Sequence, residues 1–397
     1  MEAVVLAGGL GTRMSQVIPG LPKPMAPIGE RPFLEILLRL LARKGFQRVV
    51  LSLGFMADKI VKYFGGELAG MELAYVIEDV PLGTGGAARM AMEHCTGDHV
   101  FVINGDTYLD LEVMEVEHSW QEKRWPIIVG RQASDTSRFG RLLVSEGRVV
   151  AFLEKGIAGP GLCNAGCYVL NRGQLDGFAP RSVFSLETDF LAVAAPKEPF
   201  GLFVTRGLFI DIGVPADYAR AKEDLADQGQ ARSPALFLDR DGVVNEDYGY
   251  VHRQEDFAFI DGVFDVVASA KRAGYWVVVV TNQSGIGRGF YSEDDFHRLM
   301  EWVSAQFVQR GGAIDKVYFS PDLPDSHAGS RKPSPAMILQ AVSDLDIDLP
   351  RSVLVGDKKI DIEAGIAAGV GTLLYLGSEE VTGAVRIEHV RDVLSYL

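Results

Sequence analysis

The sequence predicts an α/β protein built from two tandem domains, and three observations support this fold class. At 397 residues, the chain is longer than one hydrophobic core usually serves. Apolar strand-like runs alternate with amphipathic stretches almost throughout, which is typical of mostly parallel sheets covered on both faces. The alternation pauses once, in the polar stretch 223–234 that ends in Ser-Pro. We therefore expect domains over residues 1–226 and 234–397, joined by a linker over 227–233.

Local patterns define the expected elements of the first domain. Strands are expected in EAVVLAG, RVVLSLG, LAYVIE and HVFVING, because each run is rich in β-branched or aromatic residues and is closed by a turn residue or an acid. A helix is expected after the first strand, where Pro32 suits the first turn and Gly45 suits the stop. Its apolar residues recur with helical spacing at Leu34, Leu37, Leu38 and Leu41.

The second domain repeats the alternation. Strands are expected in ALFLDRD, YWVVVV, KVYFS, SVLVG and GTLLYL. A helix is expected in SPAMILQAV, with Ser334 as its cap and Pro335 in its first turn.

Composition narrows the functional classes. The net charge of −14 argues against nucleic acid or an anionic membrane as a partner. No apolar run approaches the roughly 20 residues that span a bilayer, and MEAVVLAGG lacks the basic region of a signal peptide. Cys95, Cys163 and Cys167 are too few for a disulfide framework, so we expect buried thiols and a cytoplasmic protein. The composition is also compatible with a homo-oligomer.

The first candidate site begins in LAGGLGTRM, where Gly8, Gly9 and Gly11 directly follow a strand. Glycines at this position let backbone N–H groups approach phosphate oxygens closely. The loop differs from the dinucleotide fingerprint, because Met14 occupies the third glycine position. It also lacks the Gly-Lys-Ser/Thr of a P-loop.

Other motifs strengthen this site. Arg13 follows the glycines, and Lys23 lies between two prolines that stiffen the backbone near a phosphate cradle. The second Gly-rich loop, PLGTGGAA at 81–88, can lie against a flat base. Asp106 and Asp211 end two strands, where paired carboxylates can hold Mg²⁺ between phosphates.

The motifs GGLGTR, PKP, PLGTGG, NGDT, EK, NAG and DIG occur in the order found in sugar-1-phosphate nucleotidyltransferases, which residues 1–225 resemble. The resemblance implies a Rossmann-like mixed-sheet domain in which a sugar 1-phosphate attacks the α-phosphorus of a nucleotide and pyrophosphate leaves. LPKPMAPIGERPFLE and IEDVPLGTGGA look most like heptose-1-phosphate guanylyltransferases, which implies GTP and heptose 1-phosphate as substrates. The implied nucleotide-binding residues are Gly8, Gly9, Gly11, Thr12, Arg13, Lys23, Gly83, Thr84 and Gly85, with Arg13 and Lys23 also catalytic. Glu154, Lys155, Asn164 and Gly166 are implied to face the sugar phosphate, and Asp106 and Asp211 to bind Mg²⁺.

A second acidic site begins in LFLDRDGVVN. Asp239 and Asp241 are two residues apart at a strand end and point the same way, so that one can attack phosphorus while the other acts as general acid and base. Three later motifs complete the set: Thr281 in VVVVTNQSGIGRG, Lys332 in SRKPSP, and Asp357 in VLVGDKKIDIEAG, with Asp361 in the next turn.

Residues 234–397 resemble the haloacid-dehalogenase-like phosphatases, which implies a Rossmannoid domain. The resemblance makes Asp239 the nucleophile that forms an aspartyl phosphate and Asp241 the acid/base. Thr281 and Lys332 are implied to steady the phosphate. Mg²⁺ is implied at Asp239, Asp357 and the Asp241 carbonyl, and the sugar phosphate at Asn282 and Arg331.

The stretch DRDGVVNEDYGYVHRQEDFAFIDGV is more similar to heptose-bisphosphate 7-phosphatases, which implies heptose 1,7-bisphosphate as the substrate. A histidinol-phosphatase interpretation shares TNQSGIGRG but fits DYGYVH poorly. Candidate cations for the distal sugar phosphate are Arg240, Arg253 and Arg288.

One segment departs from that phosphatase family, which usually carries a zinc loop after the third strand. The equivalent YFSPDLPDSHAGSRKP has no cysteine, and His327 is its only histidine. Structural zinc needs four nitrogen or sulfur ligands, so we expect no zinc.

Together the two resemblances predict one metabolic sequence. The second domain removes the 7-phosphate, and the first converts the resulting heptose 1-phosphate into a nucleotide-activated heptose for surface polysaccharide. One alternative is a fusion that makes another activated sugar, with a phosphatase for a different phosphosugar. A remote alternative is a non-catalytic regulatory subunit that senses sugar nucleotides.

Overall fold

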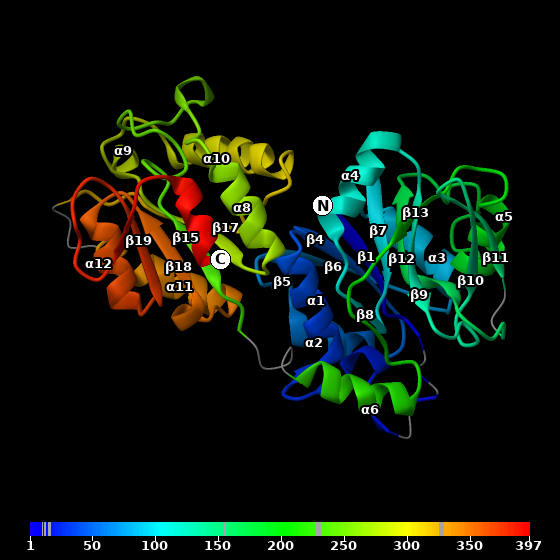
Figure 1. The fold of residues 1–397 in the computed structure, drawn as a ribbon. Helices are drawn as coiled ribbons and strands as arrows, with labels where there is room; N and C mark the ends of the chain where they lie inside the picture. The colour runs from blue at the N-terminus through cyan, green and yellow to red at the C-terminus, as the bar shows by residue number, and fades with distance from the viewer. Residues whose placement is uncertain (10, 12, 15–16, 154–155, 227–231, 325–328) are drawn as a thin grey trace. The chain divides into compact units, whose positions relative to one another are not determined.

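The computed structural model describes residues 1–9, 11, 13–14, 17–153, 156–226, 232–324 and 329–397. Four residues singled out above lie outside this part: Thr12, Glu154, Lys155 and His327. The chain divides into two compact units, Met1–Ala231 and Arg232–Leu397 (Figure 1). Among the described residues, no helix has the length and apolar character needed to cross a membrane.

The strands of the first unit are β1 (Glu2–Leu6), β2 (Pro27–Ile28), β3 (Arg31–Pro32), β4 (Arg48–Leu53), β5 (Glu67–Leu68), β6 (Met71–Ile77), β7 (His99–Asn104), β8 (Thr107–Leu109), β9 (Ile127–Ala133), β10 (Arg141–Ser145), β11 (Arg148–Leu153), β12 (Gly161–Asn171), β13 (Gly201–Val204) and β14 (Phe209–Asp211). Its helices are α1 (Phe33–Arg43), α2 (Ala57–Phe64), α3 (Gly83–Met92), α4 (Val113–Lys123), α5 (Ala192–Ala194) and α6 (Pro215–Asp224).

In the described part of the first unit, ten strands form one mixed sheet in the order β10-β11-β13-β9-β12-β7-β1-β4-β6-β5. β7, β1, β4 and β6 run parallel, as the strand–helix alternation predicted. β12 runs antiparallel to both β7 and β9, which makes the sheet mixed. β8 and β14 pair separately, with Asp211 opposite Thr107. The mixed sheet is confirmed.

Two local features of this unit differ from the sequence expectations. Residues 81–88 were expected to form a loop, but α3 begins within them at Gly83, so PLGTGG forms a turn followed by a helix. The hairpin of β10 and β11 was not expected. Glu146 and Gly147 join these strands with φ values of 52° and 72°, the left-handed pair that a two-residue hairpin turn requires.

The second unit contains β15 (Ala235–Leu238), β16 (Trp276–Asn282), β17 (Lys316–Ser320), β18 (Val353–Gly356), β19 (Thr372–Leu376) and β20 (Val385–Ile387). Its helices are α8 (Val263–Arg272), α9 (Ser284–Gly287), α10 (Glu293–Val308), α11 (Ala336–Leu345) and α12 (Lys359–Ala368). The described strands form a parallel sheet in the order β17-β16-β15-β18-β19-β20, which confirms the expected α/β class.

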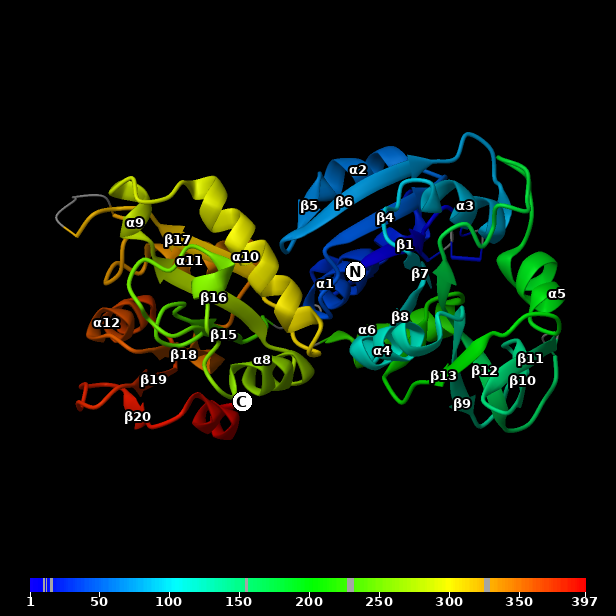
Figure 2. The same cartoon turned by 90° about the horizontal axis from the view of Figure 1, so that it is seen from above.

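Helices cover both faces of this second sheet, and the central strands β15, β16 and β18 are therefore buried on both sides. α8 contacts α10, whereas α11 contacts α12, and the two pairs lie on opposite faces (Figures 1 and 2). α11 begins one residue later than expected, with Pro335 just before it, and the Ser334 hydroxyl accepts the Ala336 N–H at 3.3 Å.

The three cysteines are confirmed as buried free thiols. Burial raises the pKa of Cys95 to about 11 and that of Cys167 to about 12, so neither thiol ionises readily. Their role is therefore packing within the first unit.

A buried ion pair joins α8 to Asp315, the residue just before β17. The Lys271 ammonium lies 2.7 Å from both carboxylate oxygens of Asp315, and the two side chains are 7% and 6% exposed. The Asp315 carboxylate also accepts the Val277 N–H at 2.7 Å. The carboxylate therefore depends on a cation and a backbone donor for its place in the core.

Lys271→Met should destabilise the second unit by about 3 kcal/mol, because it leaves the Asp315 charge buried without its cation. Urea denaturation of the full chain measures the change in the free energy of unfolding. The matched control is Arg298→Met, which removes the cation of the exposed Arg298–Asp295 pair and should cost less than about 1 kcal/mol. Equal losses for the two variants would contradict this account of the core.

Two candidate active sites

A cavity of about 490 Å³ lies at the carboxyl ends of β1 and β7, beside the start of α3. Ligand sites commonly occur at this edge of a parallel sheet, where strands end and loops diverge. Several residues singled out in the sequence line it: Gly8, Gly9, Gly11, Lys23, Gly83, Thr84 and Asp106. The sequence reasoning missed others, including Glu78, Pro81, Ala87 and Asn104.

The glycines of the first loop are constrained in different ways. A Cβ on Gly8 would lie 2.8 Å from an oxygen of Glu78, and one on Gly11 would lie 3.0 Å from the Lys23 Cβ. Gly11 also has a φ of 59°, in the left-handed region that favours glycine. A Cβ on Gly9 would meet nothing within 4 Å and would project into open space. The loop thus leaves room for a ligand beside Gly9.

Lys23 connects this loop to the acidic end of the cavity. Its ammonium lies 2.5 Å from Asp106, on a short turn flanked by Pro22 and Pro24. Asp211 lies near Asp106. The next residue, Ile212, donates its N–H to the Asp106 carbonyl at 3.0 Å and so holds the two segments together. Burial, and then the charge of Asp106, raises the pKa of Asp211. The structure therefore brings two acids and one lysine together, as the strand ends predicted.

Other predicted residues lie away from the lining of this cavity. Arg13 is exposed, and Gly85 faces the Phe184 ring, where an added Cβ would come within 2.2 Å. Asn164 is buried and donates to the Tyr168 hydroxyl at 2.6 Å and to Glu187 at 2.8 Å. Gly166 has a φ of 70°, and an added Cβ would lie 2.6 Å from the Asn104 amide. The roles assigned to these residues stay predictions.

A second cavity, of about 370 Å³, belongs to the other unit and lies at the carboxyl ends of β15 and β16. The residues predicted from the sequence that line it are Asp239, Asp241, Thr281, Asn282, Arg331 and Lys332. The sequence assigned no role to several others, including Asp247, Tyr250, Gln283, Tyr291, Lys358 and Asp361.

Lys332 is the buried cation of this cavity, with its side chain only 3% exposed. Its ammonium lies 2.6 Å from Asp239 and 2.6 Å from Asp361, and it donates to the Val280 carbonyl at 2.7 Å. Burial lowers the pKa of Lys332, but the charges of Asp239 and Asp361 outweigh it, so the net shift is upward. Burial raises the pKa of Asp239 to about 7, partly offset by Lys332.

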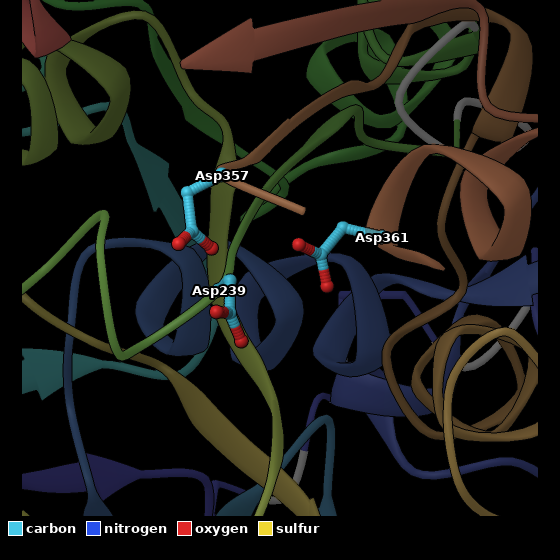
Figure 3. Close-up of side chains that lie close together, drawn as sticks. All are labelled: Asp239, Asp357 and Asp361. Carbon is cyan, nitrogen blue, oxygen red and sulfur yellow. The ribbon is translucent and has the colours of Figure 1, made fainter. Parts of the chain in front are cut away.

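Asp239, Asp357 and Asp361 converge from the end of β15, the end of β18 and the first turn of α12 (Figure 3). One oxygen of each lies within 4.8 Å of the others. Oδ1 of Asp357 is buried without a hydrogen-bond partner, and burial raises the pKa of this residue to about 6. Gly242 permits the close approach, since a Cβ there would lie 2.3 Å from Asp357.

This acidic cluster fits a hard divalent cation, because all three donors are carboxylate oxygens and one buried oxygen has no other partner. Asp361 was noted in the sequence without a role. Its signal was its position one helical turn after Asp357 in GDKKID, a spacing that returns a side chain to the same end of the sheet.

Asp241 is held by several donors. Nε and Nη2 of Arg240 lie 2.8–3.2 Å from its two oxygens, and the amides of Asn245 and Gln283 each donate at 3.0 Å. Arg240 is fully buried and also donates to the Val251 carbonyl. The proposal that Arg240 contacts a distal sugar phosphate is therefore wrong, because its guanidinium is committed to Asp241 inside the core.

The other two candidate cations have different surroundings. Arg253 is exposed and lies 3.7 Å from Glu255, and Arg288 is exposed. By contrast, Arg331 and Lys358 line the cavity itself. The Lys358 ammonium lies 2.9 Å from the Asp247 carboxylate, and both members of this ion pair line the cavity.

Two sets of hydrogen bonds fix the segment that carries Lys332. The Asn282 side chain accepts the Lys332 N–H at 3.0 Å and donates to its carbonyl at 3.2 Å. Ahead of it, the hydroxyls of Ser320 and Ser330 lie 2.9 Å apart, and both donate to Asp322. These contacts link the end of β17 to the residues just before Arg331.

Comparison with known proteins agrees with this division into two sites. Residues 2–228 match the nucleotidyl transferase family, and residues 329–394 match the HAD-hydrolase-like family. In the second unit, the chain is 48% identical over 178 residues to the D-glycero-α-D-manno-heptose-1,7-bisphosphate 7-phosphatase of Burkholderia mallei, covering 42% of this chain and 94% of that protein.

The first unit has relatives of another kind. It is 38% identical over 227 residues to the D-glycero-α-D-manno-heptose 1-phosphate guanylyltransferase of Aneurinibacillus thermoaerophilus, covering 57% of this chain and 98% of that protein. It is also similar to the crystal structure of HddC from Yersinia pseudotuberculosis complexed with GMP-PN, with a TM-score of 0.51 and 38% identity. That match covers 56% of this chain and 99% of the other.

Gly9→Ala should weaken nucleotide binding about tenfold, because the new methyl group would occupy the space through which a phosphate reaches the backbone. Its melting temperature should match that of the wild type. Isothermal titration with a non-hydrolysable GTP analogue measures the affinity.

Gly85→Ala is the matched variant, and unlike Gly9→Ala it should lower the stability of the first unit. Its methyl group would overlap the Phe184 ring, so the first unit should lose about 1–3 kcal/mol of stability. A Gly9→Ala protein that melts early and binds the analogue normally would contradict the placement of the ligand beside Gly9.

Proposed function

The chain belongs to the nucleotidyl transferase family over residues 2–228 and, in its second unit, to the HAD-like phosphatases; we therefore propose that it is a bifunctional enzyme of nucleotide-activated heptose synthesis. The second unit removes the 7-phosphate of D-glycero-D-manno-heptose 1,7-bisphosphate. The first unit transfers GMP from GTP to the resulting heptose 1-phosphate and releases pyrophosphate. The observation that carries this proposal is the presence of two separate cavities, each containing the reactive groups of one reaction.

In the phosphatase reaction, a carboxylate oxygen of Asp239 attacks the phosphorus and forms an aspartyl phosphate. Asp241 gives its proton to the departing sugar oxygen and later takes one from the attacking water. Lys332 holds Asp239 in place from 2.6 Å and supplies positive charge beside the phosphoryl group. The Thr281 hydroxyl, at the end of β16, binds a phosphoryl oxygen. Asn282 and Arg331, which also line the cavity, contact the sugar phosphate in this proposal.

In the transferase reaction, the loop of Gly8, Gly9 and Gly11 binds the nucleotide phosphates through backbone N–H groups. Lys23, held between prolines, neutralises the charge that develops on pyrophosphate as it leaves. The start of α3, at Gly83 and Thr84, borders the part of the cavity that takes the base. The sugar phosphate oxygen attacks in line with the departing group, a geometry that depends on positioning more than on covalent catalysis.

Mg²⁺ is the metal that the donor sets of both sites favour. Asp239, Asp357 and the Asp241 carbonyl, with Asp361 beside them, would hold it in one site and Asp106 and Asp211 in the other, where it would offset phosphate charge. The segment YFSPDLPDSHAGSRKP has no cysteine and therefore lacks the four nitrogen or sulfur ligands of a structural zinc site. The absence of structural zinc stays a prediction.

The relatives favour heptose over the other substrates considered. One is a phosphatase of heptose 1,7-bisphosphate and another a guanylyltransferase of heptose 1-phosphate, and these two reactions share an intermediate. This pairing accounts for the fusion more directly than an unrelated phosphosugar, histidinol phosphate or a regulatory subunit. Small-molecule substrates and reduced, buried cysteines are consistent with a cytoplasmic enzyme.

The two activities should separate by mutation. Asp239→Asn should abolish phosphate release, because an amide is a poor nucleophile, and should leave GMP transfer near the wild-type rate. Asp106→Ala should do the reverse, because it removes a metal ligand from the other site. Phosphate and pyrophosphate release are measured on each purified variant. Loss of both reactions in a folded single variant would overturn the two-site assignment.

The phosphatase should cleave the 7-phosphate and spare the 1-phosphate, since the first unit needs the 1-phosphate as its attacking group. The test is a one-pot reaction of heptose 1,7-bisphosphate, GTP and Mg²⁺, followed by analysis of phosphate, pyrophosphate and sugar products. GDP-heptose is the expected product. Accumulation of free heptose, or failure to form GDP-heptose while another sugar phosphate is readily activated, would contradict the proposed substrates.

A further inference from the structure

A buried glutamine, Gln283, links two residues of the second unit: Asp241, the proposed acid/base, and Thr281, which is proposed to bind the phosphoryl group. Gln283 follows β16 and is only 2% exposed. Its Nε2 lies 3.0 Å from the Asp241 carboxylate and 2.9 Å from the Thr281 hydroxyl. Its Oε1 lies 2.7 Å from the hydroxyl of Tyr291, which is 7% exposed. Every polar atom of the amide thus has a partner in the cavity wall.

The chemistry of these partners permits only one orientation of the amide. Both Asp241 oxygens already accept hydrogen bonds from Arg240, so the amide nitrogen faces Asp241 as a further donor and the amide oxygen faces Tyr291. The Tyr291 hydroxyl must then donate to that oxygen. His252 stacks on the Tyr291 ring at 4.8 Å with an interplanar angle of 5°, which fixes the ring that carries this donor.

The same orientation determines the direction of the Thr281 hydroxyl. Because Gln283 donates to its oxygen, the hydroxyl proton of Thr281 does not point at the amide and is available to the cavity that Thr281 lines. A phosphoryl oxygen is an acceptor, so this is the polarity that binding requires. Gln283 therefore acts on the phosphate site through Thr281 and on the proton-transfer site through Asp241.

We propose that Gln283, locked by Tyr291, is a positioning residue that aligns Asp241 for proton transfer and Thr281 for phosphoryl binding. The inference rests on the proposed phosphatase function and deepens it. Asp241 receives further hydrogen bonds from Arg240 and Asn245, but both come from its own segment. Gln283 is the partner that ties Asp241 to β16, the strand that ends in Thr281.

The role concerns one step of the reaction. As the bond from Asp239 to phosphorus forms, the bond from phosphorus to the leaving oxygen breaks, and the proton of Asp241 passes to that oxygen. An alkoxide is a poor leaving group and needs the proton, whereas 4-nitrophenolate leaves without it. Misalignment of Asp241 therefore slows alkyl phosphates more than aryl phosphates.

The experiment compares kcat/KM for glycerol 2-phosphate and 4-nitrophenyl phosphate in the full chain with Mg²⁺. Gln283→Ala should lower the alkyl value about 100-fold and the aryl value less than about tenfold, because general acid catalysis contributes mainly to the former. Tyr291→Phe removes only the hydroxyl that locks the amide. It should shift the alkyl-to-aryl ratio in the same direction by about threefold to tenfold.

Tyr318→Phe is the matched control. Tyr318 is also 7% exposed and also donates from its hydroxyl to a side chain, Asp344 at 2.7 Å, but it does not line the cavity. Its loss should leave the alkyl-to-aryl ratio unchanged. Thermal melting of all three variants shows how much each change costs in stability.

The outcomes separate the inference from the function on which it rests. A parallel fall in both substrates, with an unchanged ratio in Gln283→Ala and Tyr291→Phe, would reduce Gln283 to a structural role and overturn the inference alone. If the wild-type chain hydrolyses no phosphomonoester, the proposed phosphatase function fails and the inference fails with it. A ratio shift in the two cavity variants and none in Tyr318→Phe supports the positioning role.

Discussion

The compensation of buried charge around Lys332 is the constraint on which the second unit depends. Its ammonium lies between Asp239 and Asp361, and all three side chains are less than a tenth exposed. Burial of any one of these charges without its partners would be costly, so the lysine and the two acids depend on one another. The contacts of Lys332 with Asp239 and Asp361 therefore join the end of β15 and the first turn of α12 to the segment before α11. Substrate binding can then add a phosphate to a site whose geometry already exists.

The first unit solves the same problem with a more open site. Lys23 faces Asp106 from a turn stiffened by prolines, and Asp211 approaches from the paired strand β14. In both units the reactive groups lie where parallel strands end, because carboxyl ends meet at one edge of a sheet and diverging loops leave space there. The two sites differ in the groups that lie beside their lysines, Lys23 in the first unit and Lys332 in the second. One site has a glycine loop, the proposed nucleotide-binding segment, and the other has the Asp239 carboxylate, the proposed nucleophile.

Sequence reasoning worked where a signal is local and failed where partners come from distant segments. The strands before Gly8 and Asp239 were predictable, since short apolar runs ending in glycine or aspartate show their pattern within a few residues. The burial of Arg240 was not, because its charge alone suggests a surface residue and its pairing with Asp241 depends on the fold around it. Gln283 was hidden for the same reason: only the fold brings Asp241, Thr281 and Tyr291 around its amide. The glycines of PLGTGG predict a loop, yet α3 begins inside it, and Gly85 and Gly86 lie close against Phe184 and Ser182.

In the segment without cysteines, hydrogen bonds connect the described residues on either side of 325–328. In YFSPDLPDSHAGSRKP, the hydroxyls of Ser320 and Ser330 both donate to the Asp322 carboxylate, and Arg331 donates to the Asp322 carbonyl at 3.1 Å. These bonds join the residues on either side of 325–328, as metal ligands would, and they end directly before Lys332. Hydrogen bonds to a charged group are among the stronger ones, but each is weaker than a metal–thiolate bond, so the segment relies on several at once. The Asn282 contacts to the Lys332 backbone add a second attachment to β16. The position of Lys332 therefore follows from the hydrogen-bonded ends of this segment, and the absence of zinc stays a prediction.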